Sequence, residues 1–206
     1  MLKVWGRLSS INVQKLVWCL DEIGASFERV DAGGEHGVVN GPEYRAMNPN
    51  GLVPTLEEDG FVLWESNAIV RYLAAKHPEA RLWPEDLRVR ADADRWMDWQ
   101  ATASTPALRD AFWGLIRTPP EKRDEAAIRR SVEKTDENMA ILDRWLANRA
   151  YVAGEAFTTG DIAVGCYAHR ALNMPIDIQQ RPNVTAWYER LMARPGAAQI
   201  ATLPIT

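Results

Sequence analysis

The chain contains the stretch NPNGLVPTL at residues 48–56, followed by LWESNAIVRYL at residues 63–73, and these two segments decide how its first half folds. Each contains a short apolar run typical of a strand, and Glu58-Asp59-Gly60 between the runs is typical of a hairpin turn. Ser66 stands where a helix extending to Ala75 is expected to begin, because serine is favoured at helix N-caps. The spacing therefore predicts a hairpin followed by a helix.

The rest of residues 1–76 alternates between strand and helix patterns. Apolar residues recur at helical spacing between Ile11 and Ile23, and Gly24 ends that helix. The order of elements predicts a thioredoxin-like α/β domain, with a mixed sheet between helices. The expected strands are 2–5, 27–30, 53–57 and 61–64, the expected helices are 11–23, 42–47 and 66–75, and residues 31–40 are expected to form a loop.

The strand patterns disappear in the second half of the chain. We expect helices at 87–116, 121–147 and 182–193 and one opening at Thr158, with Pro106 kinking the first. Residues 77–86 contain two prolines and have the composition of a linker. The sequence therefore predicts two domains, a thioredoxin-like one at 1–77 and an all-α one at 87–206.

Composition excludes several classes of protein. The 206 residues include 47% hydrophobic and 25% charged ones, as in ordinary globular domains. A net charge of −4 argues against general nucleic-acid binding, and no apolar run approaches the length of a membrane span. The N-terminus is too polar for a signal peptide. Neither the two cysteines nor the three histidines have metal-ligand spacing, so we expect no metal site and a reducing, cytoplasmic location; these residues are Cys19, Cys166, His36, His77 and His169.

The pattern of residues 48–73 resembles the glutathione-binding signature of soluble glutathione transferases, in spacing as well as in residue type. Thr158 and Asp161 resemble the helix-capping box of that family's second domain, and residues 187–195 resemble its late helix. The resemblance covers essentially the whole chain and is closest to bacterial members whose first helix begins with serine and asparagine. It implies a cytoplasmic, homodimeric detoxification enzyme that uses glutathione as co-substrate.

The signature has a physical explanation in the chemistry of glutathione, which is a tripeptide. In the family the proline is typically cis, so that Val53 before Pro54, together with Leu52, would present backbone groups to the cysteinyl part of glutathione as a strand does. The alternative is that Pro54 only starts an edge strand. Glu65 would bind the γ-glutamyl amine, and Ser66 at a helix N-terminus would bind its carboxylate. The simpler alternatives are that Ser66 only caps the helix and that Glu65 is a solvated acid.

The thiol of glutathione needs activation, because only the thiolate attacks. Ser10 and Asn12 lie at the expected start of the first helix, where hydrogen-bond donors to sulfur belong, and the resemblance implies that one or both activate it. Ser9 is a weaker candidate, and capping of the helix is the alternative role. No tyrosine or cysteine stands in this loop, and Cys19 is expected to be a buried, inert thiol.

The residues for the second substrate are expected in the second domain and the first loop. Arg109, Trp113 and Arg117 are spaced at i, i+4 and i+8 and suit a substrate with an apolar body and a negative group, although a core tryptophan with flanking arginines is equally compatible. Many family members carry Lys or His around Gly51-Leu52 for the glycyl carboxylate, and this chain does not. Arg7 is the candidate replacement and also a candidate for the electrophile site.

These observations together favour a glutathione S-transferase that conjugates the thiolate to a small electrophile. Proximity and thiolate stabilisation would supply the catalysis. One alternative is a glutathione-dependent disulfide or peroxide reductase on the same fold, which needs room for two glutathiones. The other is a non-catalytic, glutathione-transferase-like binding protein, which would have lost the residues that contact the thiol.

Overall fold

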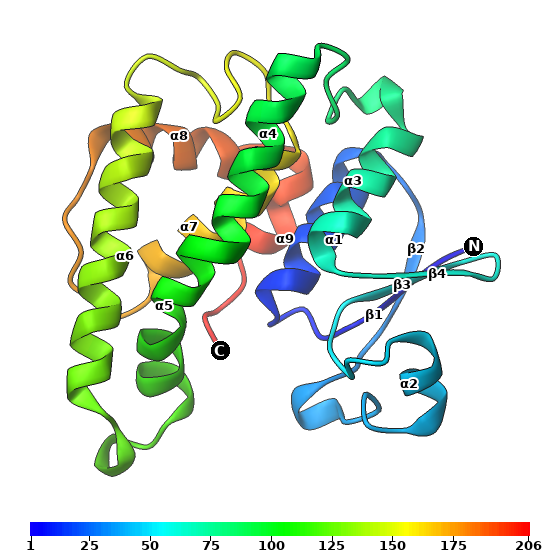
Figure 1. Cartoon of the computed structure of the whole chain (residues 1–206), viewed down its shortest axis with the longest axis horizontal. Coiled ribbons are helices and arrows are strands. Elements are labelled where there is room, and N and C mark those ends of the chain that lie inside the picture. Colours follow the sequence, from blue (N-terminus) through cyan, green and yellow to red (C-terminus); the bar gives the residue numbers. More distant parts are fainter.

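The computed structural model describes residues 1–206, and its first half is built on a four-stranded mixed sheet (Figure 1). The strand order is β2-β1-β3-β4, with β1 parallel to β2 and the other pairs antiparallel. Fully buried Val4 of β1 stands opposite Leu56 of β3, so the sheet contributes directly to the core. The strands are β1 (Leu2–Trp5), β2 (Phe27–Val30), β3 (Thr55–Glu58) and β4 (Phe61–Trp64).

Three helices cover this sheet. Helices α1 (Ile11–Glu22) and α3 (Ser66–Lys76) pack against each other on one face, and α2 (Pro42–Met47) lies on the other (Figure 1). The arrangement confirms the predicted thioredoxin-like α/β fold. The expected hairpin also forms, with Asp59 and Gly60 both at positive φ, as a two-residue type I′ turn requires.

Strand β3 is shorter than expected, because it begins at Thr55 and not at Val53. The Val53–Pro54 peptide bond is cis, and Pro54 has no N–H to donate to a neighbouring strand. Residues 52–54 therefore form an approach to the strand, with the backbone N–H and C=O of Val53 unpaired within the chain.

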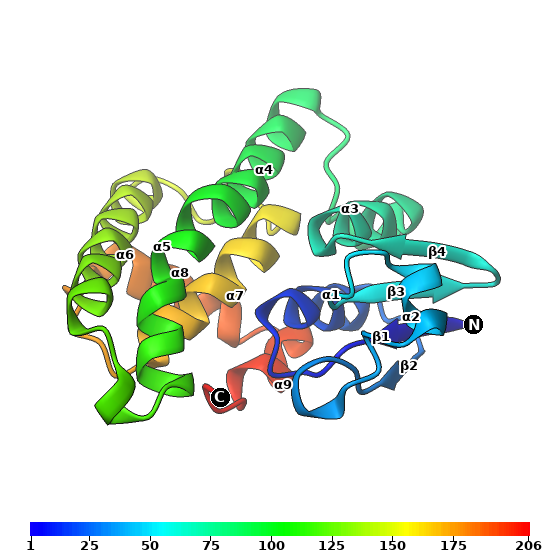
Figure 2. The same ribbon diagram turned by 60° about the horizontal axis from the view of Figure 1, so that its bottom comes forward.

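The second half is entirely helical, as predicted, and lies beside the sheet domain (Figures 1 and 2). Its mostly buried helix α7 packs against α1, so the two halves share one core. No helix in the chain has the length and apolar character needed to cross a bilayer. The main helices are α4 (Leu87–Trp99), α5 (Thr105–Phe112), α6 (Glu125–Leu146), α7 (Thr159–Asn173), α8 (Pro182–Met192) and α9 (Ala198–Ala201).

The helix expected at 87–116 is divided by wide turns. A π turn, η3 (Gln100–Ser104), separates α4 from α5, and a second, η4 (Trp113–Arg117), follows α5. Pro106 lacks an N–H and its ring crowds the carbonyl four residues back, at Thr102, so η3 lies where an ordinary α-turn would be disfavoured. Short 3₁₀ turns lie at η1 (Gly34–His36), η2 (Pro78–Ala80), η5 (Pro120–Lys122) and η6 (Pro195–Ala197).

Helix α6 begins at Glu125, four residues later than expected. Pro119-Pro120 leads into a 3₁₀ turn, and the Asp124 side chain then accepts hydrogen bonds from the N–H groups of Ala126 and Ala127. The cap at Asp124 therefore determines where this helix starts.

Candidate active site

The predicted site residues lie around two neighbouring cavities at the junction of the two halves. The arginine cavity has about 270 Å³ and the lysine cavity about 470 Å³, and Asn12 and Thr105 line both. We define the arginine cavity by Arg7, Ser9, Ser10, Asn12, Thr105, Arg109, Phe112, Trp113, Arg117 and Arg170, and the lysine cavity by Asn12, Lys15, Glu65, Ser66, Asn67, Arg71, Asp98, Gln100 and Thr105.

The first loop brings Ser10 and Asn12 to these cavities. Ser10 is the N-cap residue of α1 in extended conformation, but its side chain makes no capping hydrogen bond. The Ser10 hydroxyl therefore does not cap the helix, which was the alternative role that the sequence allowed. Asn12 accepts a hydrogen bond at Oδ1 from the Ser66 hydroxyl, at 3.3 Å, while its amide nitrogen donates to no group of the protein.

The loop before β3 is fixed by side chains behind it. The Tyr44 hydroxyl and Asn48 Nδ2 donate to the carbonyl of Leu52, at 2.8 and 2.9 Å, so this carbonyl is already occupied. The Leu52 side chain is exposed. Val53 is thus the residue of this loop whose backbone is available to an extended peptide.

The start of α3 differs from the expectation by one residue. Glu65, not Ser66, is the N-cap, and its φ of 75° lies in a region that non-glycine residues rarely occupy. Ser66 is the first helical residue and is buried. Its hydroxyl accepts a hydrogen bond from Lys15 and donates one to Asn12. Glu65 remains exposed at the edge of the lysine cavity, without an ion-pair partner.

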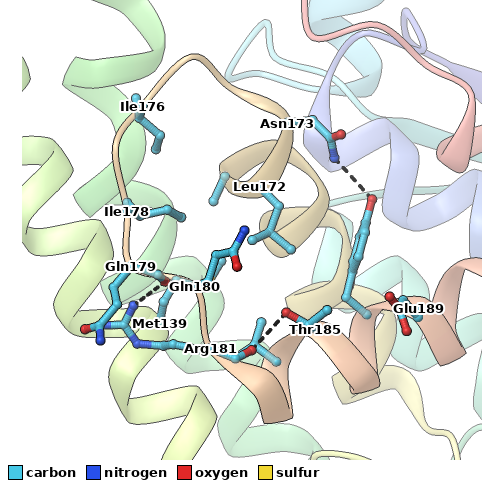
Figure 3. A pocket seen from close by; sticks show the side chains of 13 residues that line it. Met139, Leu172, Asn173, Ile176, Ile178, Gln179, Gln180, Arg181, Thr185 and Glu189 are labelled. Atoms are coloured by element: carbon cyan, nitrogen blue, oxygen red, sulfur yellow. Dashed lines mark hydrogen bonds between the residues drawn. The ribbon is translucent and has the colours of Figure 1, made fainter.

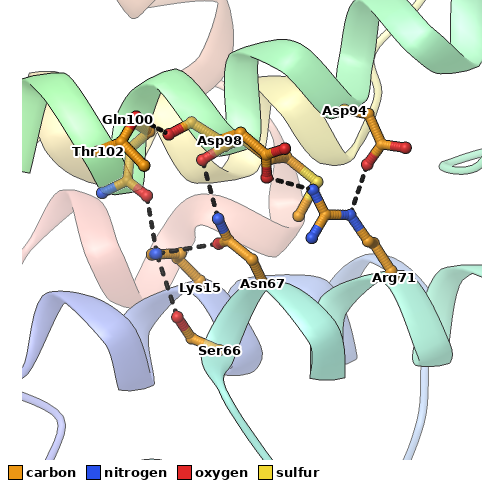
Figure 4. A network of polar contacts seen from close by, with 9 residues as sticks. Lys15, Ser66, Asn67, Arg71, Asp94, Asp98, Gln100 and Thr102 are labelled. Carbon is orange, nitrogen blue, oxygen red and sulfur yellow. Dashed lines mark hydrogen bonds and ion pairs between the residues drawn. The ribbon is translucent and has the colours of Figure 1, made fainter.

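Lys15 is a site residue that the sequence analysis missed. Its side chain is 1% exposed, and burial lowers the pKa of its ammonium group to about 8. Figure 4 shows the ammonium donating to Ser66, Asn67 and Gln100, which come from α3 and η3. The signal was present in the sequence, because Lys15 is four residues after Ile11 and four before Cys19, on the buried side of α1.

The arginine cavity carries a strong positive charge. Arg7, Arg109, Arg117 and Arg170 line it, and no Asp or Glu does. Arg109 pairs with Asp110, which does not line the cavity, at 3.3 Å. Arg117 donates to a main-chain oxygen of Thr206 at 2.8 Å, and neither Arg7, Arg117 nor Arg170 pairs with an Asp or Glu. Burial, followed by repulsion from Arg117, lowers the pKa of Arg7, and burial lowers that of Arg170 to about 10. Arg170, which the sequence analysis did not identify, stacks on Phe112 at 4.3 Å and donates to the Ser9 carbonyl.

Trp113 is not the core tryptophan that the sequence allowed as an alternative. Trp96 is buried in the core, while Trp113 is 58% exposed and lines the arginine cavity. The two cysteines are buried and line neither cavity, and burial raises the pKa of both thiols to about 12. No cluster of His, Cys, Asp or Glu has the composition of a metal site.

A third hollow, between α6, α7 and α8, contains none of the predicted site residues (Figure 3). Its cation, Arg181, forms a bidentate ion pair with Asp136, at 2.7 and 2.8 Å. The charge of this arginine is therefore neutralised by a carboxylate, whereas Arg7, Arg117 and Arg170 of the arginine cavity pair with no Asp or Glu.

Two family models match two separate parts of the chain. Residues 1–75 match the glutathione S-transferase N-terminal domain, and residues 105–195 match the glutathione S-transferase C-terminal domain. The chain belongs to the glutathione S-transferase family. This transferase is an enzyme that uses glutathione as its co-substrate.

Relatives of the transferase match it over its full length. It is 41% identical to glutathione S-transferase GstB of Escherichia coli, with both chains fully covered, and 31% identical to the probable glutathione S-transferase GSTF2 of rice over 98% of the chain and 96% of the relative. A theta class glutathione S-transferase from Xanthomonas axonopodis pv. citri, solved with glutathione bound, superposes with a TM-score of 0.96 at 42% identity, covering 100% of this chain and 99% of that one. Poplar glutathione transferase F7 superposes with a TM-score of 0.88 at 28% identity and 98% coverage of both chains.

Proposed function

We propose that this transferase activates glutathione with Asn12 and Ser10 and conjugates it to a small electrophile that carries a negative group beside an apolar body. The observation that carries the proposal is the position of Asn12, which borders both cavities. A ligand in one cavity and a ligand in the other meet at this residue.

Glutathione is proposed to occupy the lysine cavity and the loop before β3. Glu65 binds the γ-glutamyl amine, and Ser66, with the N-terminus of α3, binds the γ-glutamyl carboxylate. Leu52, Val53 and Pro54 form the strand-like edge along which the cysteinyl residue lies, with the free backbone groups of Val53 as its hydrogen-bond partners. This placement directs the thiol toward Asn12.

Thiol activation is proposed to follow the serine/asparagine type. The Asn12 amide and the Ser10 hydroxyl donate to sulfur beside the N-terminus of α1, whose free N–H groups and dipole also favour an anion. Each unit by which they lower the thiol pKa is about 1.4 kcal/mol of preferential binding of the thiolate. The thiolate forms a bond to carbon while the bond to the leaving group breaks, and the leaving group departs with that electron pair.

The electrophile is proposed to lie in the arginine cavity. Trp113 and Phe112 offer apolar surface, and Arg7 and Arg109, joined by Arg117 and Arg170, offer charge for an anionic group. Arg7 shares this cavity with Arg117 and Arg170, so we assign it to the electrophile and not to the glycyl carboxylate of glutathione.

A matched pair of substrates tests this assignment. Iodoacetate and iodoacetamide have the same leaving group and nearly the same size, but only iodoacetate is charged. We expect Arg117→Leu to lower kcat/KM for iodoacetate by about tenfold or more, as for loss of a charge-assisted hydrogen bond, with little change for iodoacetamide. Arg130→Leu, at an exposed position away from the cavity, is the control. An equal effect on both substrates would contradict the assignment, and turnover of a mixed disulfide of glutathione in preference to either would favour the reductase alternative.

Three further expectations are part of the proposal. The limits of the two domains are 1–77 and 87–206, the enzyme is a homodimer, and it works in the cytoplasm. Sedimentation velocity of the purified protein tests the dimer, and limited proteolysis between residues 77 and 87 tests the domain limits.

A further inference from the structure

Lys15 is a buried cation without a carboxylate partner, although it lines a cavity. Its ammonium donates to Ser66 Oγ at 3.1 Å, Asn67 Oδ1 at 3.0 Å and Gln100 Oε1 at 2.8 Å, and all three acceptors belong to uncharged side chains. The side chain is 1% exposed. An isolated buried charge is costly unless it is paired, so this arrangement favours an anion in the adjoining cavity.

The other charged groups around Lys15 do not neutralise it by contact. Arg71 is held by two acids of α4, Asp94 and Asp98, as Figure 4 shows. Glu65 is the acid whose field reaches Lys15, but it forms no ion pair with it. Cys166 of α7 also faces Lys15, and burial raises the pKa of this thiol to about 12, so it stays protonated at neutral pH.

The hydrogen bonds of Lys15 also determine what Ser66 can do. All three N–H groups of the ammonium are occupied, and one of them uses a lone pair of Ser66 Oγ. The Ser66 hydroxyl must therefore donate elsewhere, and in this structure it donates to Asn12 Oδ1, which lines the same cavity. Lys15 thus holds Ser66 as a donor, whose single proton goes to Asn12 in the free enzyme and would turn to a carboxylate bound in the cavity.

We propose that Lys15 is a positioning residue for the α-carboxylate of the γ-glutamyl group of glutathione. Lys15 does not touch the carboxylate but provides a positive charge behind Ser66, to which it is hydrogen-bonded. The inference rests on the proposed function in one respect, namely that the γ-glutamyl group lies on Ser66. Lys15 acts through the Ser66 hydroxyl and through its field, which is strong in this desolvated region. Lys15 then selects for a γ-glutamyl group over an acyl group that has the amine alone.

The proposal predicts a proton linkage. A carboxylate bound in front of Lys15 raises its pKa above the value of about 8 that burial gives it. Lys15 in the complex therefore holds its proton more tightly than Lys15 in the free enzyme does. The affinity for a ligand with the carboxylate is accordingly greatest below pH 8 and falls as the pH rises above 8. A ligand without the carboxylate does not show this loss.

Two thioether ligands provide the test, because neither has a thiol that titrates. S-methylglutathione carries the carboxylate, and γ-aminobutyryl-S-methylcysteinylglycine lacks only that group. By isothermal titration calorimetry at pH 7, we expect Lys15→Met to weaken binding of S-methylglutathione by about 30-fold, as for loss of a charge-assisted interaction, and binding of the analogue by less than about threefold. Lys122→Met, at an exposed position on η5, is the control.

Wild-type enzyme gives an independent readout if Lys15→Met does not fold. Between pH 7 and pH 9 its preference for S-methylglutathione over the analogue, corrected for the ionisation of each ligand's own amine in solution, is expected to fall about tenfold. Equal weakening of both ligands in a folded Lys15→Met, or a preference that does not change with pH, would overturn the role of Lys15. If wild-type enzyme bound neither ligand, the glutathione site itself would be wrong, which is a separate result.

Discussion

The Ser66 hydroxyl donates to Asn12 Oδ1 across 3.3 Å, which joins the first turn of α3 to the first turn of α1. Asn12 thereby uses its acceptor within the protein and leaves its amide N–H groups for a ligand. Since Ser66 lies in the lysine cavity and Asn12 in both cavities, the contact connects the proposed carboxylate site with the proposed thiol site.

Removal of the proposed thiol donors should raise the thiol pKa of bound glutathione. We expect Asn12→Ala to reduce kcat/KM by about a hundredfold, or about 2–4 kcal/mol in the transition state, and Ser10→Ala to have the same or a smaller effect. Thiolate absorbance in the ultraviolet against pH measures the pKa directly. Ser9→Ala tests the weaker candidate donor in the same loop, and Lys122→Met, at an exposed position that lines neither cavity, is the control. A double variant of Ser10 and Asn12 that keeps the wild-type pKa and rate would show that neither residue activates sulfur.

Ser66→Ala should weaken glutathione binding by about 1–3 kcal/mol, because a donor to a charged group is lost and Lys15 loses one acceptor. Equilibrium binding measured by calorimetry tests this, with the fold checked by circular dichroism. Unchanged affinity in a folded protein would place the γ-glutamyl carboxylate elsewhere.

The two cysteines should be dispensable for conjugation. Cys19 and Cys166 are buried, and thiols with a pKa of about 12 are not ionised at neutral pH. The double replacement by Ala should therefore keep the conjugation rate near that of wild type, even if some packing is lost. A large fall in rate without loss of folding would instead support redox chemistry.

Asp161→Ala should destabilise the protein more than an ordinary helix cap does. The carboxylate accepts from the backbone N–H groups of Val152 and Thr158 and from Trp187 Nε1, at 2.9–3.0 Å, and all are buried. Leaving them unpaired should cost about 3 kcal/mol or more in the free energy of unfolding. Asp124→Ala, which removes the exposed cap of α6, is the comparison and should cost about 1 kcal/mol.

Denaturant unfolding measures both changes. The thiol pKa of bound glutathione should be the same in Asp161→Ala as in wild type, because Asp161 lines neither cavity. A shifted thiol pKa with normal stability would mean that Asp161 belongs to the active site.

The elements predicted best from sequence were those fixed by local signals. The hairpin with its turn at 58–60 depends on neighbouring residues, so its pattern is legible in one short segment. The start of α3 was misplaced by one residue because two tertiary hydrogen bonds, one that Ser66 accepts from Lys15 and one that it donates to Asn12, determine the orientation of Ser66. No local rule contains that information.

Two site residues were missed for the same reason, namely that their roles depend on tertiary contacts. Lys15 and Arg170 lie on buried helix faces, and each acquires its role from segments far away in the chain. For Lys15 the decisive partner is Gln100, 85 residues later, and for Arg170 it is the carbonyl of Ser9, 161 residues earlier. Helical periodicity marks such a polar residue as unusual, but only the packed structure shows what it contacts.

The π turn at Gln100–Ser104 sets the rotational phase of everything that follows it on the same helical rod. A π turn holds one more residue than an α-turn, and one residue corresponds to about 100° of rotation around a helix axis. Shortening this segment by one residue would leave Trp96 and Met97 in the core while turning Arg109 and Trp113 away from the arginine cavity. The extra residue therefore allows α5 to place Leu108 and Ala111 in the core while Arg109 and Trp113 reach the cavity.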